Sequence, residues 1–307
     1  MKLPTVTVLM PVYNAELYLS VAVESILTQT LKDFEFLIIN DGSADKSPEI
    51  LKKYAAQDKR IKILAQENQG LVVSLNRGIK EASGKYIARQ DADDKSAPDR
   101  LKKQVEFLKT HPKVVIAGSC ISVIDEKSRI MYRHALLLND PELRQELLVR
   151  SPFAHGSVIF EREIAIEAGL YQQSSWPTED YDFWLRLSAL GEMANLEEDL
   201  YLYREHKAGI SKKNANLQIK KIESVRSRAW QQRSRLLPKR KINLDNYKSL
   251  NMGQERIERI VDNTVFVSKL AWGNNQKSLA FKNMSMLAGH RVTYKKAAGK
   301  IKRRIKK

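Results

Sequence analysis

Apolar and polar positions follow a regular order over roughly the first 120 residues of the chain. Short runs of Val, Ile, Leu and Phe alternate with stretches of about ten to fifteen residues whose apolar positions recur at helical spacing. The runs predict strands at Thr5–Tyr13, Phe34–Asn40, Ile61–Leu64, Tyr86–Gln90 and Val114–Gly118. The stretches between them predict helices at Glu16–Gln29, Pro48–Ala56, Gly70–Ala82 and Pro98–Thr110.

This alternation predicts an α/β fold with a mixed, mainly parallel sheet flanked by helices. Right-handed crossovers place the carboxyl ends of parallel strands at one edge of the sheet, where open α/β sheets bind ligands. Tyr13-Asn14, Asn40-Asp41 and Asp91–Asp94 each follow a predicted strand. We therefore expect these three segments to converge, although they are far apart in the sequence.

The pattern is less regular after residue 120. Strands are predicted at Ile121–Ile124, Ile130–Leu138, Ser157–Glu161 and Leu200–Arg204, and helices at Pro141–Val149 and Asp180–Leu190. From about Ser211 onward the sequence is helical and basic. The chain thus divides into a first domain of residues 1–210 and a basic helical region of residues 211–307.

The net charge of +17 is concentrated in the second of these regions. Residues 1–206 contain 26 Lys and Arg against 31 Asp and Glu, a balance of −5. The remaining residues contain 27 against 5, a balance of +22. Such an asymmetry indicates an anionic partner for the C-terminal region: a membrane surface, a nucleic acid or an acidic polymer.

The single cysteine and the lack of a long apolar segment indicate a reducing, cytoplasmic compartment. Cys120 is the only cysteine and lies in the apolar run Val114–Ile124, which predicts a buried thiol and no disulfide framework. That run is the longest uncharged apolar segment, and a bilayer span needs about 20 residues. The N-terminus shows no signal peptide pattern. We expect a soluble or peripheral cytoplasmic protein.

Asp91-Ala92-Asp93-Asp94 is the strongest candidate for chemistry. Carboxylates gathered at a strand end repel one another unless a cation lies among them. Mg²⁺ and Mn²⁺ prefer oxygen ligands, and Mg²⁺ is typically held by one or two carboxylates plus substrate phosphates. The alternative is a solvated acidic turn in which Asp94 or Ser96 caps the next helix.

The nucleotide sites that depend on glycine are excluded. No two glycines have the G-x-G spacing, and Gly84-Lys85 is followed by Tyr86 rather than by Ser or Thr. Diphosphate charge would therefore have to be met by a metal or by basic side chains. Asp41, in Asn40-Asp41-Gly42-Ser43, could accept from a pyrimidine N–H, although this tetrapeptide is also ideal for a β-turn.

A set of motifs in order resembles the family 2 glycosyltransferases with the GT-A fold, over about residues 4–211. The motifs are Pro11-Val12-Tyr13-Asn14, Asn40-Asp41-Gly42-Ser43, Asn68-Gln69-Gly70 with Ser74 and Asn76-Arg77-Gly78, Arg89–Asp94 with Arg100-Leu101 and Gln104, Gly169-Leu170-Tyr171, Thr178–Arg186 and Tyr203-Arg204-Glu205-His206. The basic C-terminal region has no counterpart in this resemblance. The Q-x-x-R-W signature of processive members is absent, which favours transfer of a single sugar.

The resemblance implies transfer of a hexose or N-acetylhexosamine from a nucleotide diphosphate to an acceptor hydroxyl, with inversion. It assigns the nucleotide-sugar pocket to Pro11, Tyr13, Glu16, Asp41, Ser74, Asp91 and Ala92. Asp93 would ligate Mn²⁺ or Mg²⁺, Asp91 would lie between ribose and metal, and His206 would be a further metal ligand. Asp94 would support this site or be structural.

The resemblance also implies a catalytic base, because inversion requires one group to activate the acceptor hydroxyl. Asp180, paired with Glu179, matches that base, and adjacent carboxylates raise one another's pKa. The alternative is a pair of acids favoured by a helix N-terminus. His155 and Trp176 are candidates for contact with the acceptor or donor sugar. Trp184 and Arg186 are expected to be packing residues.

UDP-sugars are the favoured donors, with dTDP as an alternative that presents the same imide edge. The expected acceptors are glycans of capsule, lipopolysaccharide or cell wall, or lipid-linked oligosaccharides. Two other functions stay open: a non-catalytic adaptor on the same fold, and a nucleotidyltransferase, which the missing Gly-rich basic loop disfavours. An adaptor would not need Asp91, Asp93 and Asp180 together.

Residues 212–307 combine basic residues with aromatic and aliphatic ones, including Trp230 and Trp272. Such a composition suits attachment to an anionic membrane surface. A solvated basic appendage is the alternative. Nucleic-acid binding is unlikely because no zinc, RNP or recognition-helix motif is present.

Overall fold

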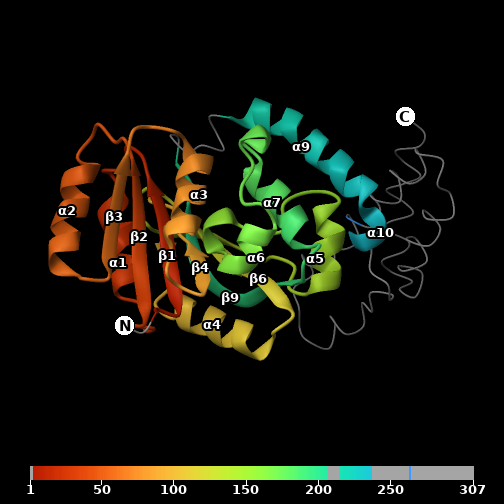
Figure 1. Ribbon diagram of the computed structural model, residues 1–307, viewed down its shortest axis with the longest axis horizontal. Helices are drawn as coiled ribbons and strands as arrows, with labels where there is room; N and C mark the ends of the chain where they lie inside the picture. The colour runs from red at the N-terminus through yellow and green to blue at the C-terminus, as the bar shows by residue number, and fades with distance from the viewer. Residues whose placement is uncertain (1–2, 207–213, 237–262, 264–307) are drawn as a thin grey trace.

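The computed structural model describes residues 3–206, 214–236 and 263. One sheet runs through the molecule, and helices cover both of its faces (Figure 1). The strands are β1 (Val6–Val12), β2 (Phe34–Asp41), β3 (Ile61–Gln66), β4 (Tyr86–Arg89), β5 (Lys95–Ser96), β6 (Val114–Ile124), β7 (Ile130–His134), β8 (Ile159–Glu161) and β9 (Glu192–Arg204).

The helices follow the order of the sequence pattern in the N-terminal half. They are α1 (Leu19–Leu27), α2 (Ser47–Gln57), α3 (Leu71–Glu81), α4 (Arg100–Thr110), α5 (Asp140–Leu147), α6 (Arg162–Glu167), α7 (Glu179–Leu187), α9 (Ala215–Gln231) and α10 (Arg233–Leu236). Two short 3₁₀ turns belong to the second half: η1 (His155–Ser157) lies between α5 and β8, and η2 (Gln173–Ser175) lies between α6 and α7.

The strand order is β3-β2-β1-β4-β8-β6-β9-β5, with β7 paired to the outer part of β6. β1, β2, β3 and β4 pair in parallel, and β6 pairs in parallel with β9. β8 is antiparallel to both β4 and β6, so these two strands keep the same direction. This confirms the predicted mixed, mainly parallel sheet, and it brings the ends of β1, β2, β4, β6 and β9 to one edge.

Alternate residues of the central strands bury themselves in two cores, one on each face. Leu9, Leu37 and Ile39 belong to the core beneath α3, α5 and α7, whereas Met10 and Ile38 belong to the core beneath α1, α2 and α4. Parallel strands covered on both faces are apolar at almost every position, which is why their sequences read as continuous runs.

Several boundaries differ from the prediction. β6 is a single strand of 11 residues that unites two predicted strands, and β9 is 13 residues long where only its last part was predicted. β5 and α6 were not predicted. Residues of β9 such as Glu197 and Glu198 are exposed, so the polar stretch of this strand gave no strand signal.

Two predicted helix caps are wrong. Asp94 and Ser96 do not cap α4, which begins at Arg100 after Asp99. The structural reason is that Asp94 accepts from the Arg204 backbone N–H, while the Ser96 hydroxyl donates to Gln90.

The N-cap residue of α2 is Lys46, although Asp45 and Ser47 on either side of it are residue types that commonly cap helices. Asp45 still accepts from the Ser47 N–H, and the Ser47 hydroxyl accepts from the Ala15 N–H. These contacts tie the start of the helix to the loop that follows β1.

The described part of the basic C-terminal region shares the core of the first domain. Val225 and Ala229 of α9 are fully buried in the same core as α5 and α7, and Ile222 and Trp230 pack against it. Trp230, proposed above for a membrane-facing surface, is half-buried and packs in part against this core. The other apolar residues proposed for that surface lie outside the described residues.

Two further expectations concern single features. Cys120 is fully buried, as predicted. Within the described part of the chain, no helix is long and apolar enough to cross a bilayer.

Candidate active site

The loops after β1 and β2 are joined by side chains that the turn-forming sequences supply. The Asn14 N–H donates to the Ser43 hydroxyl at 3.1 Å, and the Asn14 side chain accepts from the Ala44 N–H at 2.9 Å. Asn40 accepts from the Ser43 N–H, which is the turn chemistry expected of Asn-Asp-Gly-Ser. Two of the three predicted strand ends are thus in direct contact.

Asp41 lies at the end of β2 and is only 3% exposed. Its carboxylate accepts from the backbone N–H groups of Gln69 and Gly70, each at 2.9 Å, and from the Gln66 side chain at 2.7 Å. Gly42 permits this close approach, because a Cβ there would lie 2.7 Å from the Asn68 nitrogen. Asp41 therefore orders the loop that opens α3, whatever it contributes to base recognition.

The other residues predicted for the nucleotide pocket differ in access. Tyr13 is 53% exposed at the end of β1, and Pro11 is partly exposed beside it. Glu16 is exposed, and its carboxylate accepts from the Lys46 N–H. Ser74 is fully buried and accepts from Gln66 at 3.1 Å, so it reaches Asp41 only through that side chain.

The acidic segment Asp91–Asp94 follows β4, and Arg89 is the last residue of that strand. The Arg89 guanidinium donates to Asp91 at 2.7 Å and is 1% exposed, whereas the Asp91 side chain is 31% exposed. Burial raises the pKa of Asp91, and the charge of Arg89 opposes that rise. Ala92 packs against the core beneath α1, which orients the acids on either side of it.

Asp94, which was expected to support the site or to be structural, joins the acidic segment to the end of β9. It is 2% exposed and accepts from the Arg204 N–H at 2.6 Å. Burial, together with the charges of Asp93 and Asp91, raises its pKa well above the ordinary value. The contact holds the end of β9 beside the acidic segment.

Arg204 connects that segment to the β6–β7 hairpin. It is 2% exposed, and its guanidinium donates to the carbonyl of Asp93 at 2.7 Å, to the carbonyl of Asp125 at 2.8 Å and to the Ser128 hydroxyl at 3.0 Å. Its guanidinium carbon lies 4.5 Å from the centroid of the Tyr18 ring. One side chain thus fixes three loops.

Asp93 and His206 form the pair that could hold a metal ion. His206 Nε2 lies 2.8 Å from Asp93 Oδ2, and the Asp93 side chain is 37% exposed. Among the described residues no group of three His, Cys, Asp or Glu side chains could hold a metal alone. A carboxylate and an imidazole fit Mn²⁺, or Mg²⁺ less well, when diphosphate and water supply the other ligands.

Glu179 and Asp180 begin α7 and face the same edge. Burial raises the pKa of Asp180 to about 6, although its carboxylate also accepts from the Ser151 hydroxyl at 3.4 Å. Burial and the charge of Asp180 raise the pKa of Glu179 to about 7. The charge of Arg89, which pairs with Asp91, opposes part of both rises.

His155 lies in η1, the turn before β8, and Trp176 lies in the turn before α7. His155 Nε2 lies 3.0 Å from the Tyr171 hydroxyl, and burial lowers the pKa of His155 well below its ordinary value, so the ring is neutral. Gly156 lets this turn approach Asp91 Oδ2, which would lie 2.7 Å from a Cβ. Trp176 is partly buried in the turn before α7.

Trp184 and Arg186 are packing residues, as predicted. Trp184 is fully buried against the rings of Phe153 and His155, and Arg186 pairs with Asp182.

Sequence reasoning missed several residues that organise the site. Tyr201 accepts from the Asp91 N–H at 3.1 Å and is fully buried, but in sequence it is one aromatic residue of a strand. Tyr18 and Ser151 likewise carry no signal. Among these residues only Arg204 could have been noticed in the sequence, because it directly follows the apolar run Leu200–Tyr203 at the end of a predicted strand.

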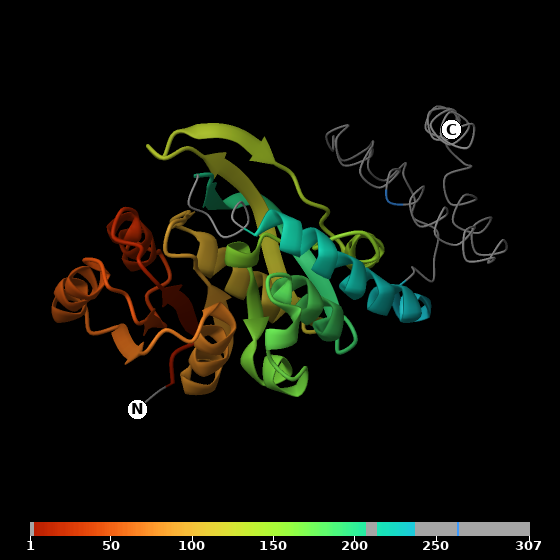
Figure 2. The ribbon, with the colours of Figure 1, turned by 90° about the horizontal axis from the view of Figure 1, so that it is seen from above.

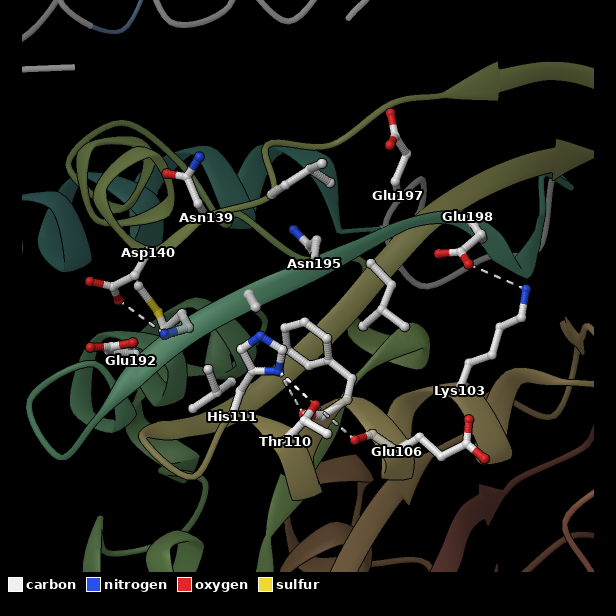
Figure 3. Close-up of a pocket in the computed structure, with 16 residues that line it drawn as sticks. Lys103, Glu106, Thr110, His111, Asn139, Asp140, Glu192, Asn195, Glu197 and Glu198 are labelled. Atoms are coloured by element: carbon white, nitrogen blue, oxygen red, sulfur yellow. Dashed lines mark hydrogen bonds and ion pairs between the residues drawn. The ribbon is translucent and has the colours of Figure 1, made fainter. Parts of the chain in front are cut away.

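A groove of about 670 Å³ lies elsewhere, between α4, the starts of β6 and α5, and β9 (Figure 3). An ion pair between Lys103 and Glu198 crosses part of it at 3.3 Å. None of the predicted site residues lines this groove, so it is separate from the candidate active site.

The family model for glycosyl transferase family 2 matches residues 7–169, which include the β1, β2 and β4 ends. The chain belongs to this family. The match ends before Glu179 and Asp180, so the acid pair at α7 rests on the structure and on the sequence motif around it.

Curated relatives extend the family assignment. A glycosyltransferase from Haemophilus influenzae is 35% identical over 215 residues, which cover 66% of this chain and 66% of the relative. The amylovoran biosynthesis glycosyltransferase AmsE of Erwinia amylovora is 32% identical, covering 64% and 75%. The O-antigen biosynthesis glycosyltransferase WbnJ of Escherichia coli is 32% identical, covering 68% and 83%.

Solved structures show the same fold. Residues 1–349 of S. aureus TarS with UDP-GlcNAc match with a TM-score of 0.60 at 16% identity, covering 97% of this chain and 92% of that one. The mannosyltransferase PcManGT of Pyrobaculum calidifontis, with GDP-Man and Mn²⁺, matches with a TM-score of 0.57 at 16% identity, covering 94% and 76%. The GT-A fold predicted from sequence is confirmed.

The role of Arg204 can be tested by Arg204→Lys. Lysine keeps the charge but cannot donate to the acidic segment and to the β6–β7 turn at once, so we expect the free energy of unfolding to fall by about 2–3 kcal/mol. Chemical denaturation measures this change. The control is Arg129→Lys, at a 74%-exposed ion pair, where the change should stay below about 0.5 kcal/mol. Equal losses in the two variants would show that Arg204 does not join the loops.

Proposed function

We propose that this protein is a metal-dependent, inverting glycosyltransferase that moves one sugar from a nucleotide-diphosphate donor to an acceptor hydroxyl. The observation that carries the proposal is the meeting of two acid groups at one sheet edge. Asp91 and Asp93 follow β4, Glu179 and Asp180 begin α7, and the charges of Asp91 and of its partner Arg89 both act on Glu179.

Asp180 is the proposed base. Its carboxylate, with a pKa raised to about 6, is mostly ionised at neutral pH and basic enough to accept the proton of an acceptor hydroxyl. The acceptor oxygen then forms a bond to the anomeric carbon while the bond from that carbon to the diphosphate oxygen breaks. The bonding electrons leave with the nucleotide diphosphate, and a single displacement inverts the configuration.

The donor half of the site would lie at the ends of β1, β2 and β4. Tyr13 offers an exposed ring for the base, and the ordered Asp41 loop forms the floor behind it. Asp93 and His206, with Asp91, would hold Mn²⁺ or Mg²⁺. When bound, the ion would supply positive charge that stabilises the leaving diphosphate. UDP-sugars are the favoured donors.

The acceptor would be a glycan of the cell surface. Two relatives are named for amylovoran and O-antigen biosynthesis, and TarS and PcManGT were solved with UDP-GlcNAc and GDP-Man. These names support a polysaccharide acceptor and a sugar nucleotide donor. A non-catalytic adaptor is less consistent with the site, because burying carboxylates with raised pKa values costs stability without serving binding.

Asp180→Asn tests the base. We expect the transfer rate to fall by about 10²- to 10⁴-fold, because the amide cannot accept the proton, while donor affinity is kept. The wild-type rate should fall about tenfold per pH unit below pH 6, since only the ionised carboxylate is active. Steady-state kinetics and donor titration measure both.

The control is Glu167→Gln, an exposed acid on α6 that should leave the rate unchanged. Stability gives a second readout. Because the folded-state pKa of Asp180 is above its ordinary value of 3.8, its ionisation lowers stability as pH rises through 6. Asp180→Asn should therefore be more stable at pH 7.5, by roughly 1 kcal/mol. Full transfer activity in Asp180→Asn would refute the base assignment.

A donor panel tests the reaction itself. UDP-, dTDP- and GDP-sugars are scored for nucleotide release with Mn²⁺, with Mg²⁺ and with EDTA. We expect release from a UDP-sugar in the presence of metal and its loss in EDTA. Asp93→Asn should weaken activation by Mn²⁺ at least about tenfold, whereas Asp99→Asn, an exposed acid nearby, should not. Activity unaffected by EDTA would eliminate the metal.

We further propose that the protein works at the cytoplasmic face of the membrane, attached through its basic C-terminal region. The balance of +22 beyond residue 206 supports this, since each basic residue near anionic lipid contributes about 1 kcal/mol. The full chain should co-sediment with vesicles that contain phosphatidylglycerol at physiological salt, and not with neutral vesicles. Equal recovery with both kinds of vesicle would end this proposal.

A further inference from the structure

α9 lies across the segment that leads into the acid pair (Figures 1 and 2). Gln218 donates to the Pro177 carbonyl at 3.2 Å, and the Lys221 ammonium donates to the Ser174 carbonyl at 2.8 Å. Both carbonyls belong to the turn that ends at Glu179. The side chains of one helix thus hold the backbone just before the proposed base.

Arg228 extends this contact to α7 itself. Its guanidinium lies 2.8 Å from Asp182 Oδ1, and the Asp182 side chain is 4% exposed. The same guanidinium lies 3.4 Å from the Ser175 hydroxyl. Residues two apart on a helix point in nearly opposite directions, so Asp182 anchors the side of α7 that faces away from Asp180.

An apolar seam fixes α9 in register for these contacts. Val225 and Ala229 are fully buried, and Ile222 packs against the same core. Arg226 adds a bond to the Val149 carbonyl at 2.7 Å. Because the seam cannot slide without exposing apolar surface, the polar contacts of α9 have one fixed geometry.

We propose that α9 is a brace that positions Asp180, with Gln218, Lys221 and Arg228 as positioning residues that act through the turn and through Asp182. The proposal rests on the function proposed above. The contacts of α9 given above are to the turn before α7, to α7 and to Val149, whereas the ends of β1, β2 and β4 form the proposed donor half of the site. Loss of the brace should therefore lower kcat and leave donor binding intact.

The variant Lys221→Met with Arg228→Met tests the brace. We expect kcat to fall about ten- to a hundredfold, as small misplacements of a catalytic group do, while the donor KM stays within about twofold. The matched control is Lys220→Met with Arg235→Met, which removes the same charge from exposed positions of α9 and α10. Arg228→Lys, which keeps a cation beside Asp182, should recover part of the rate.

Hydrogen exchange provides a readout that needs no activity. Amides of residues 173–187 should exchange faster in the double variant than in its control, and amides of β1 and β2 should not change. Unchanged exchange at residues 173–187, or unchanged kcat despite faster exchange, would overturn the brace. If wild-type protein transfers no sugar from any donor, the proposed function fails, and the exchange experiment still decides whether α9 holds the turn.

Discussion

The ion pair between Arg89 and Asp91 is the contact on which the active-site edge depends. Arg89 is almost completely buried, and a buried guanidinium without a counter-ion would be strongly destabilising. Its charge also opposes part of the rise that burial causes in the pKa values of Glu179 and Asp180, and it adds to burial in lowering the pKa of His155. The strand β4 thus supplies one buried positive charge that acts on acids contributed by two distant segments.

Two further buried arginines complete the arrangement. Arg100 donates to the Arg89 carbonyl and to Gln90, which fixes the end of β4, and Arg204 joins the acidic segment to β9 and the β6–β7 hairpin. Burial lowers the pKa of Arg100 to about 10, so it stays charged at neutral pH. These arginines hold the backbone around the acidic segment in place, while the Asp93 side chain stays accessible to solvent.

The parts of the fold that were predictable share a physical cause. β1, β2 and β4 are covered on both faces, so almost all of their residues are buried and their sequences are nearly continuous apolar runs. The helices that alternate with them each have one apolar face. β9 was predicted only in its last part because its middle is exposed, and the buried pairing that makes it a strand comes from β6. The cap predicted at Asp94 failed for a similar reason, since a partner 110 residues away takes its carboxylate.

The sequence by itself determined the α/β class and the acidic residues that end β4. It also placed an acid pair before a helix, because strand ends and short acidic motifs are local features of the chain. Only the tertiary structure decided which acids are buried, since burial depends on contacts between distant segments. It buried Asp94 and Ser74 against Arg204 and Gln66 and paired the buried Arg89 with Asp91. It also laid α9 against the turn before Asp180, where composition had indicated only a basic tail.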